Sequence, residues 1–209
     1  MTTLRGLLGR KLGMTRVFNS QGQAVAVTVV EVGPCTVIQK KTREHDGYNA
    51  LQIGFSPKRF SRMTRPEQGH VKKAGLEYGF YHVEEFPVED PGSYELGQVI
   101  TLQEFGNLTF VDVRGVTKGH GFTGTVKRYG FHRGKMTHGS KCHREMGSVG
   151  QSAYPSRVIK GKRMPGRMGG VQCTVKNTLV VDVRHEDNLL LLKGAVPGPA
   201  NQVVSIRCK

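Results

Sequence analysis

Short runs of β-branched and aliphatic residues, partly alternating with polar residues, recur along most of the chain. They occupy residues 23–32, 36–41, 48–55, 98–102 and 108–116, and the pattern returns at residues 171–185 and 189–196. Turn-forming sequences separate them, such as NSQG at Asn19 and EHDG at Glu44. Runs of this length and composition predict strands. Because they have hairpin spacing and flank an intervening segment on both sides, they predict a single antiparallel β-barrel assembled from both ends of the chain.

One helix is predicted, in the sequence MTRPEQGHVKKAGL. Thr64 and Glu67 have the spacing of a capping box, and Pro66 lies in the first turn. Two lysines follow near the end, where they complement the helix dipole, and Gly75 can adopt the left-handed conformation that ends a helix. The pattern predicts a helix of about two to three turns.

The segment before this helix is basic, with Lys58, Arg59, Arg62 and Arg65. Two interpretations stay open for it: a solvated surface, or a patch that contacts phosphates. With the helix it forms a small helical and basic insertion at about residues 56–90 of the predicted barrel.

The charge of the chain is concentrated between residues 115 and 170. The 209 residues carry a net charge of +15, and this segment holds 12 of the 31 Lys and Arg but a single acid, Glu145. It also contains 13 glycines, no leucine and only seven Val, Ile or Phe residues. A segment so charged and so poor in apolar residues cannot bury enough surface to fold alone, and it favours a polyanionic partner. We therefore expect two parts: a discontinuous barrel domain of residues 1–114 and 171–209, and an extended finger of residues 115–170.

Gly119, Gly121 and Gly124 have the G-x-G-x-x-G spacing of dinucleotide-binding loops. Such a loop also requires an apolar helix after it, whose N-terminus holds the pyrophosphate. The residues after Gly124 contain further glycines and no apolar stripe of helical period, although Glu145 lies near the distance at which an acid would bind a ribose. Glycines alternating with basic residues are better explained by a backbone that runs close to phosphates and bases. No cofactor is predicted.

Catalytic and metal sites are also poorly supported. The histidines of the basic segment have only Glu145 as a carboxylate that could orient them, so contact with RNA explains them more simply than general-base catalysis. The four cysteines include no C-x-x-C pair, and Cys142 beside His143 lacks a second pair of ligands. No catalytic residue and no metal are predicted. With no signal peptide and no apolar run long enough to span a bilayer, the chain is expected to stay in the cytoplasm.

The stretch from Phe105 to Arg128 resembles the signature of the L-three family of large-ribosomal-subunit proteins. The matching positions are Phe105, Asp112, Gly115, Thr117, Gly119, His120, Gly121, Gly124 and Arg128. Further matches are LGRKLGMTRVF near the start, THGS at Thr137, GSVGQ at Gly147, GKRMPGRMGG at Gly161 and NLLLLKGAVPG at Asn188. The resemblance covers essentially the whole chain and is of the bacterial type, because the archaeal and eukaryotic relatives carry long extensions.

This resemblance implies a non-enzymatic structural protein of the large (50S) ribosomal subunit. It implies a mainly β fold: a translation-protein-like antiparallel barrel with a small helical insertion, and a long, basic, Gly-rich finger that reaches toward the peptidyl transferase centre. The implied partners are 23S rRNA, which family members bind early in subunit assembly, and neighbouring ribosomal proteins. Gln151 matches a glutamine that some bacterial members carry as N5-methylglutamine, which would add a glutamine methyltransferase as a partner.

The residues expected to contact RNA are the basic side chains of the finger and of the second patch, most of them through phosphates. They are Lys118, His120, Lys127, Arg128, Arg133, Lys135, Lys141, His143, Arg144, Arg157, Lys160, Lys162, Arg163 and Arg167, together with Lys58, Arg59 and Arg62. The alternative from another class is a free RNA chaperone or RNA-modifying enzyme that uses the same basic segment.

Overall fold

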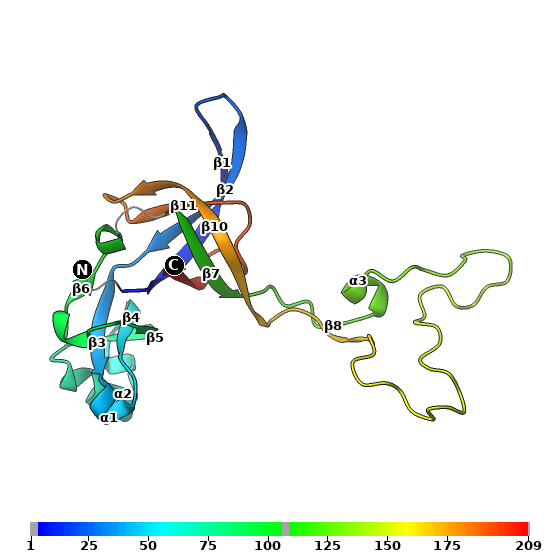
Figure 1. Ribbon diagram of the computed structural model, residues 1–209, viewed down its shortest axis with the longest axis horizontal. Helices are drawn as coiled ribbons and strands as arrows, with labels where there is room; N and C mark the ends of the chain where they lie inside the picture. The colour runs from blue at the N-terminus through cyan, green and yellow to red at the C-terminus, as the bar shows by residue number, and fades with distance from the viewer. Residues whose placement is uncertain (1–3, 106–108, 209) are drawn as a thin grey trace. The chain divides into compact units, whose positions relative to one another are not determined.

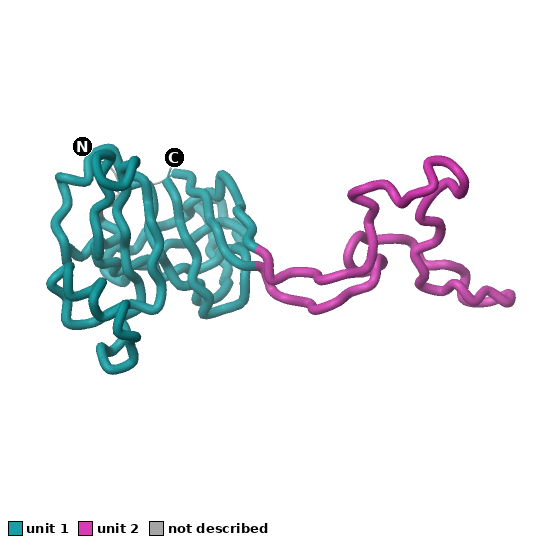
Figure 2. The backbone as a smooth tube through the Cα atoms, turned by 90° about the horizontal axis from the view of Figure 1, so that it is seen from below, with its two compact units in different colours: residues 1–116, 172–209 teal, residues 117–171 magenta. Residues whose placement is uncertain are grey.

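The computed structural model describes residues 4–105 and 109–208. The chain divides into two compact units, which Figure 2 shows in different colours. Unit 1 consists of residues 1–116 and 172–209, and unit 2 of residues 117–171. Leu108, the first residue of one predicted strand, lies outside the described residues.

A closed antiparallel barrel forms the larger part of unit 1 (Figure 1). Its strand order is β1-β12-β7-β10-β11-β2. The strands are β1 (Gly6–Phe18), β2 (Ala24–Val32), β7 (Phe110–Val116), β10 (Gln172–Arg184), β11 (Leu189–Lys193) and β12 (Val203–Cys208). Strand β12 lies between β1 and β7, so the two ends of the chain are neighbours in the barrel. The predicted barrel built from both ends of the chain is therefore confirmed.

A second antiparallel sheet belongs to the same unit, and the prediction of a single barrel was wrong in this respect. Its order is β5-β4-β3-β6, with β3 (Cys35–Lys41), β4 (Ala50–Lys58), β5 (Gly79–Pro87) and β6 (Val99–Ile100). The runs at residues 36–41 and 48–55 are strands, as expected, but they pair with each other in this sheet. Hairpin spacing predicts which strands pair locally, and it does not say which sheet the hairpin joins.

The helices of unit 1 are short. They are α1 (Arg43–Asp46), α2 (Arg65–Lys73), and three 3-10 turns: η1 (Phe60–Arg62), η2 (Pro91–Ser93) and η3 (Leu102–Phe105). Helix α2 confirms the predicted helix: the Glu67 carboxylate accepts a hydrogen bond from the Thr64 N–H at 2.9 Å, completing a capping box. Gly75, two residues beyond the helix, has a φ of +72°.

The barrel and the second sheet share one apolar core. Leu7, Val30 and Ile206 of the barrel and Ile53 and Phe86 of the sheet belong to the same buried cluster. Strand β1 approaches the sheet so closely that a Cβ added to Gly6 would overlap the Phe86 ring, so only glycine fits there. Because both sheets contribute side chains to this one core, they form a single compact unit rather than two domains.

Lys11 is buried where strand β1 meets the loop between β11 and β12. Its ammonium group donates hydrogen bonds to the carbonyl oxygens of Val196 and Gly198, both at 2.8 Å. The backbone of Lys11 also bonds to this loop, donating to the Gln202 carbonyl and accepting from the Asn201 N–H. A buried ammonium that satisfies two carbonyls holds the loop against the barrel.

We expect the substitution Lys11→Met to lower the free energy of unfolding by about 2 kcal/mol, because it keeps most of the side chain's volume but leaves two buried carbonyls unpaired. Urea denaturation of the RNA-free protein measures this difference. Lys193→Met, at an exposed lysine of β11, is the matched control and should change stability by less than about 0.5 kcal/mol. Equal stability of the two variants would contradict the role given to Lys11.

Candidate nucleic-acid interface

The start and the end of unit 2 run side by side as a narrow ribbon. The Thr117 N–H donates to the Val171 carbonyl at 2.9 Å, and the N–H groups of His120 and Met168 each donate across the ribbon at 2.9 Å. Strands β8 (Phe122–Thr123) and β9 (Gly166–Arg167) continue this pairing. Gly169 has a φ of +71°, and an added Cβ would overlap the Lys118 carbonyl oxygen. The glycines of this segment thus let two backbones approach each other.

A helix does follow Gly124, which the sequence did not predict. Helix α3 spans Thr125–Tyr129 and ends at Gly130, whose φ is +71°. Its five residues form little more than one turn, and a Rossmann motif requires a full helix packed on a parallel sheet. The short helix therefore does not provide the helix that a Rossmann motif requires.

Tyr129 holds a small cluster of cations and aromatic rings in unit 2. The guanidinium carbon of Arg128 lies 5.0 Å from the centre of the Tyr129 ring, and that of Arg163 lies 5.6 Å from it. Arg128 also donates to the Met164 carbonyl at 2.7 Å. These contacts join two segments that are far apart in the sequence, and they substitute for an apolar core. Only Thr123 and Thr125 are buried among residues 117–171, all of which the structure describes.

The segment that contains Gln151 folds back on itself. The Ser148 hydroxyl donates to the Gly150 carbonyl at 2.9 Å, and the Ser156 hydroxyl donates to the Ala153 carbonyl. Gln151 is exposed and lines a depression of about 320 Å3 together with Arg157 and Lys162. The Gln151 amide is therefore open to a ligand or a modifying enzyme.

Most of the predicted RNA-contacting side chains of unit 2 are exposed, and most make no hydrogen bond or ion pair with another described residue. Lys118, His120, Lys127, Arg133, Lys135, Lys141, Arg144, Arg157, Lys160, Lys162 and Arg167 are of this kind. Arg128, Arg163 and His143 have contacts within the unit, since His143 bonds to the Lys135 carbonyl at 3.0 Å and the other two contact Tyr129. These three side chains help to position the chain, a role that could not be inferred from the sequence.

The second basic patch lies on unit 1, around strand β5. Arg59 is exposed, whereas Lys58 forms an ion pair with Glu67 at 3.1 Å. Lys58 also lies 5.8 Å from the centre of the Tyr81 ring, and Arg62 donates to the Tyr81 hydroxyl at 3.4 Å. An exposed aromatic ring flanked by two cations is a common arrangement in RNA-binding surfaces.

No three His, Cys, Asp or Glu side chains come together to hold a metal within residues 4–105 and 109–208. In the same ranges, no helix is both long and apolar enough to cross a membrane. The acid of the basic segment, Glu145, hydrogen-bonds to Cys142 and so raises the pKa of that thiol. A raised pKa favours the protonated thiol over the thiolate that binds metals.

Comparison with known proteins finds a matching family model and many similar proteins, of which one illustrates the likeness. The family model described as Ribosomal protein L3 matches residues 92–188. The Large ribosomal subunit protein uL3 of Desulfotalea psychrophila is 51% identical over 210 residues, and the alignment covers 100% of both chains. The chain belongs to the ribosomal protein L3 family, bacterial type, and is a structural protein of the large ribosomal subunit rather than an enzyme.

Proposed function

We propose that this protein binds 23S rRNA directly, and that unit 2 is its principal RNA-binding element. As a ribosomal protein, it works in the cytoplasm. The observation that carries the proposal is the combination of many exposed cations, a single acid and only two buried side chains in residues 117–171. Such a segment repels itself and buries little, so rRNA phosphates both neutralise it and supply the contacts it lacks.

The exposure of the cations and the glycine content of the segment support two kinds of contact. Exposed lysines and arginines bond to phosphate oxygens, and the glycines let the backbone approach the RNA. The cluster around Tyr129 holds helix α3 next to the segment of Arg163 and Met164 before RNA is bound. Most of these contacts fix the position of the protein on the RNA without reading its sequence.

The wider role proposed here rests on the family resemblance together with these surfaces. The protein joins the large subunit early in assembly, contacts neighbouring ribosomal proteins, and extends residues 115–170 through the rRNA toward the peptidyl transferase centre. Gln151 is the candidate site of N5-methylation by a glutamine methyltransferase, and its exposed amide in the folded-back segment supports this assignment.

Replacing Lys160, Lys162 and Arg163 by Gln in one triple variant should flatten the salt dependence of binding to 23S rRNA. Each phosphate contact contributes about −0.9 to the slope of log K against log salt concentration on B-form duplexes and about −0.7 on single strands, so losing three contacts should reduce the steepness of the slope by about 2 to 3. Filter binding across a salt series measures it. The control replaces three exposed cations of unit 1, Arg43, Lys176 and Lys193, with Gln. An equal change in both triple variants would show that only net charge matters.

Gly147→Arg and Gln151→Glu should leave the free energy of unfolding of the RNA-free protein within about 0.5 kcal/mol, because neither residue contributes to the core of unit 1. In cells they should impair large-subunit assembly or alter sensitivity to drugs that bind near the peptidyl transferase centre. Sucrose-gradient profiles and drug-response curves measure these effects. Gln21→Glu, on an exposed turn of unit 1, makes the same chemical change as Gln151→Glu and serves as its control. Normal profiles and drug responses in both test variants would refute the role given to Gln151.

A further inference from the structure

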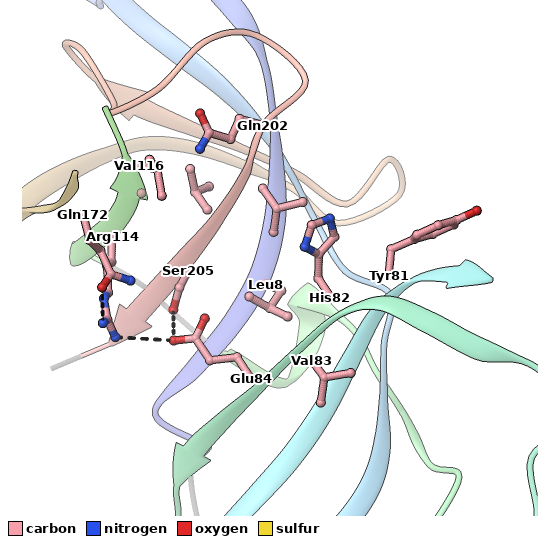
Figure 3. Close-up of a pocket in the computed structure, with 13 residues that line it drawn as sticks. Leu8, Tyr81, His82, Val83, Glu84, Arg114, Val116, Gln172, Gln202 and Ser205 are labelled. Atoms are coloured by element: carbon pink, nitrogen blue, oxygen red, sulfur yellow. Dashed lines mark hydrogen bonds and ion pairs between the residues drawn. The ribbon is translucent and has the colours of Figure 1, made fainter. Parts of the chain in front are cut away.

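Unit 1 contains an open pocket of about 370 Å3 between strand β5 and the barrel strands β1, β7, β10 and β12 (Figure 3). Leu8 and Val204 form part of its apolar floor. Its polar lining includes His82, Glu84, Arg114, Gln172, Gln202 and Ser205. The volume lies in the range of pockets that bind small organic groups.

The acidic group in this pocket, Glu84, is already engaged by neighbouring side chains. One of its carboxylate oxygens lies 3.8 Å from Arg114 and 3.4 Å from Arg207, and it accepts a hydrogen bond from Ser205 at 3.2 Å. Arg114 also donates to the Gln172 amide oxygen at 2.5 Å. One carboxylate shared by two guanidinium groups leaves this side of the pocket with net positive charge.

His82 and Gln202 face the pocket, and their side chains make no hydrogen bond with another described residue. In Figure 3 the His82 ring and Glu84 project from β5 on the side of the barrel strands, whereas Tyr81 points away. Partial burial, and then the charge of Arg10, lower the pKa of His82, so its ring is neutral near pH 7. A neutral imidazole offers one donor and one acceptor, and the Gln202 amide offers two donors and one acceptor.

Cations lie near two residues of β5 that line the pocket, Tyr81 and His82. Strand β5 lies at the edge of its sheet, and several of its side chains are exposed. Tyr81, which is 51% exposed, carries Lys58 and Arg62 beside its ring. On the other side of the strand, Arg10 lies close enough to His82 to affect its pKa. A polyanion that passes over this edge would find phosphate partners next to a pocket lined by groups that hydrogen-bond.

We propose that this pocket holds one unpaired nucleotide of the bound RNA, with His82 and Gln202 bonding to the edge of its base. The flanking phosphates lie along Lys58 and Arg62, beside the Tyr81 ring. This inference rests on the proposed RNA-binding function and adds a defined site on unit 1 to it. Single-stranded RNA is recognised in this way, by bases splayed into pockets and hydrogen-bonded along their edges. An acidic peptide would also meet the cations, but it does not account for unpaired donors and acceptors above an apolar floor.

Titration of the full-length protein with AMP, GMP, CMP and UMP, followed by NMR of the histidine ring and glutamine amide signals, tests the site. At least one nucleotide should shift the His82 and Gln202 signals saturably. His82→Ala and Gln202→Ala should each weaken that binding about five- to tenfold, the loss expected for one net hydrogen bond. His185→Ala, at an exposed histidine of a turn, should leave the affinity unchanged.

Binding to 23S rRNA, measured with the same variants, separates this inference from the general function. If wild-type protein binds rRNA with steep salt dependence but no mononucleotide shifts His82, the pocket assignment is wrong and the RNA-binding function stands. If wild-type protein does not bind rRNA at all, the proposed function fails first. Protection of His82 by a neighbouring ribosomal protein, with no effect of nucleotides or rRNA, would also overturn the assignment.

Discussion

The pairing of β7 with β10 is the interaction on which the rest of the structure depends. Val116 at the end of β7 faces Gln172 at the start of β10, and residues 117–171 separate them in the sequence. Closing a loop of this length costs about 3 to 4 kcal/mol of chain entropy. The core of unit 1 compensates, because β7 contributes Val111 and Val113, both fully buried. The barrel is thus closed by strands that also bring the two ends of unit 2 together.

The two units reflect two ways of stabilising a chain. Unit 1 buries leucine, isoleucine and valine side chains from both of its sheets. The Lys11 ammonium group donates hydrogen bonds to two carbonyl groups of the loop between β11 and β12. Unit 2 has almost nothing to bury, and its internal contacts are backbone pairing near its ends and the cluster around Tyr129. A low apolar content and a high positive charge would be a defect in an isolated domain. In a ribosomal protein they suit a segment that we propose is completed by RNA.

Several parts of the fold could be predicted because their sequence signals are local. β-Branched runs located β2, β3, β4 and β7, and the capping residues located α2. Strands β1, β5 and β12 were missed, and the structure gives a physical reason for β1 and β5. Strand β1 is buried almost continuously at its start, so it shows no alternation, and its glycines and cations suggest a loop. Strand β5 is largely exposed and lies at a sheet edge, where little burial shapes the sequence.

The functional features also differ in how far the sequence predicts them. Charge and glycine content revealed the basic segment, since a property summed over many residues does not depend on the fold. The expectation that this segment contacts RNA near the peptidyl transferase centre stays a prediction. Buried Lys11 was missed because a lysine in a sequence looks like a surface charge, and only its two carbonyl partners show otherwise.

The pocket beside β5 could not have been found from the sequence, because its lining comes from five strands that are distant along the chain. Its presence would change how binding energy is distributed. Under these proposals, unit 2 supplies salt-dependent contacts and the pocket supplies a contact that depends on hydrogen bonds. Once unit 2 is attached to the RNA, the pocket meets its nucleotide at a high effective concentration. A weak single-nucleotide site can then contribute substantially to the complex. Positioning unit 1 on the RNA would thus depend on base-edge contacts, whereas overall affinity would depend mainly on phosphate contacts.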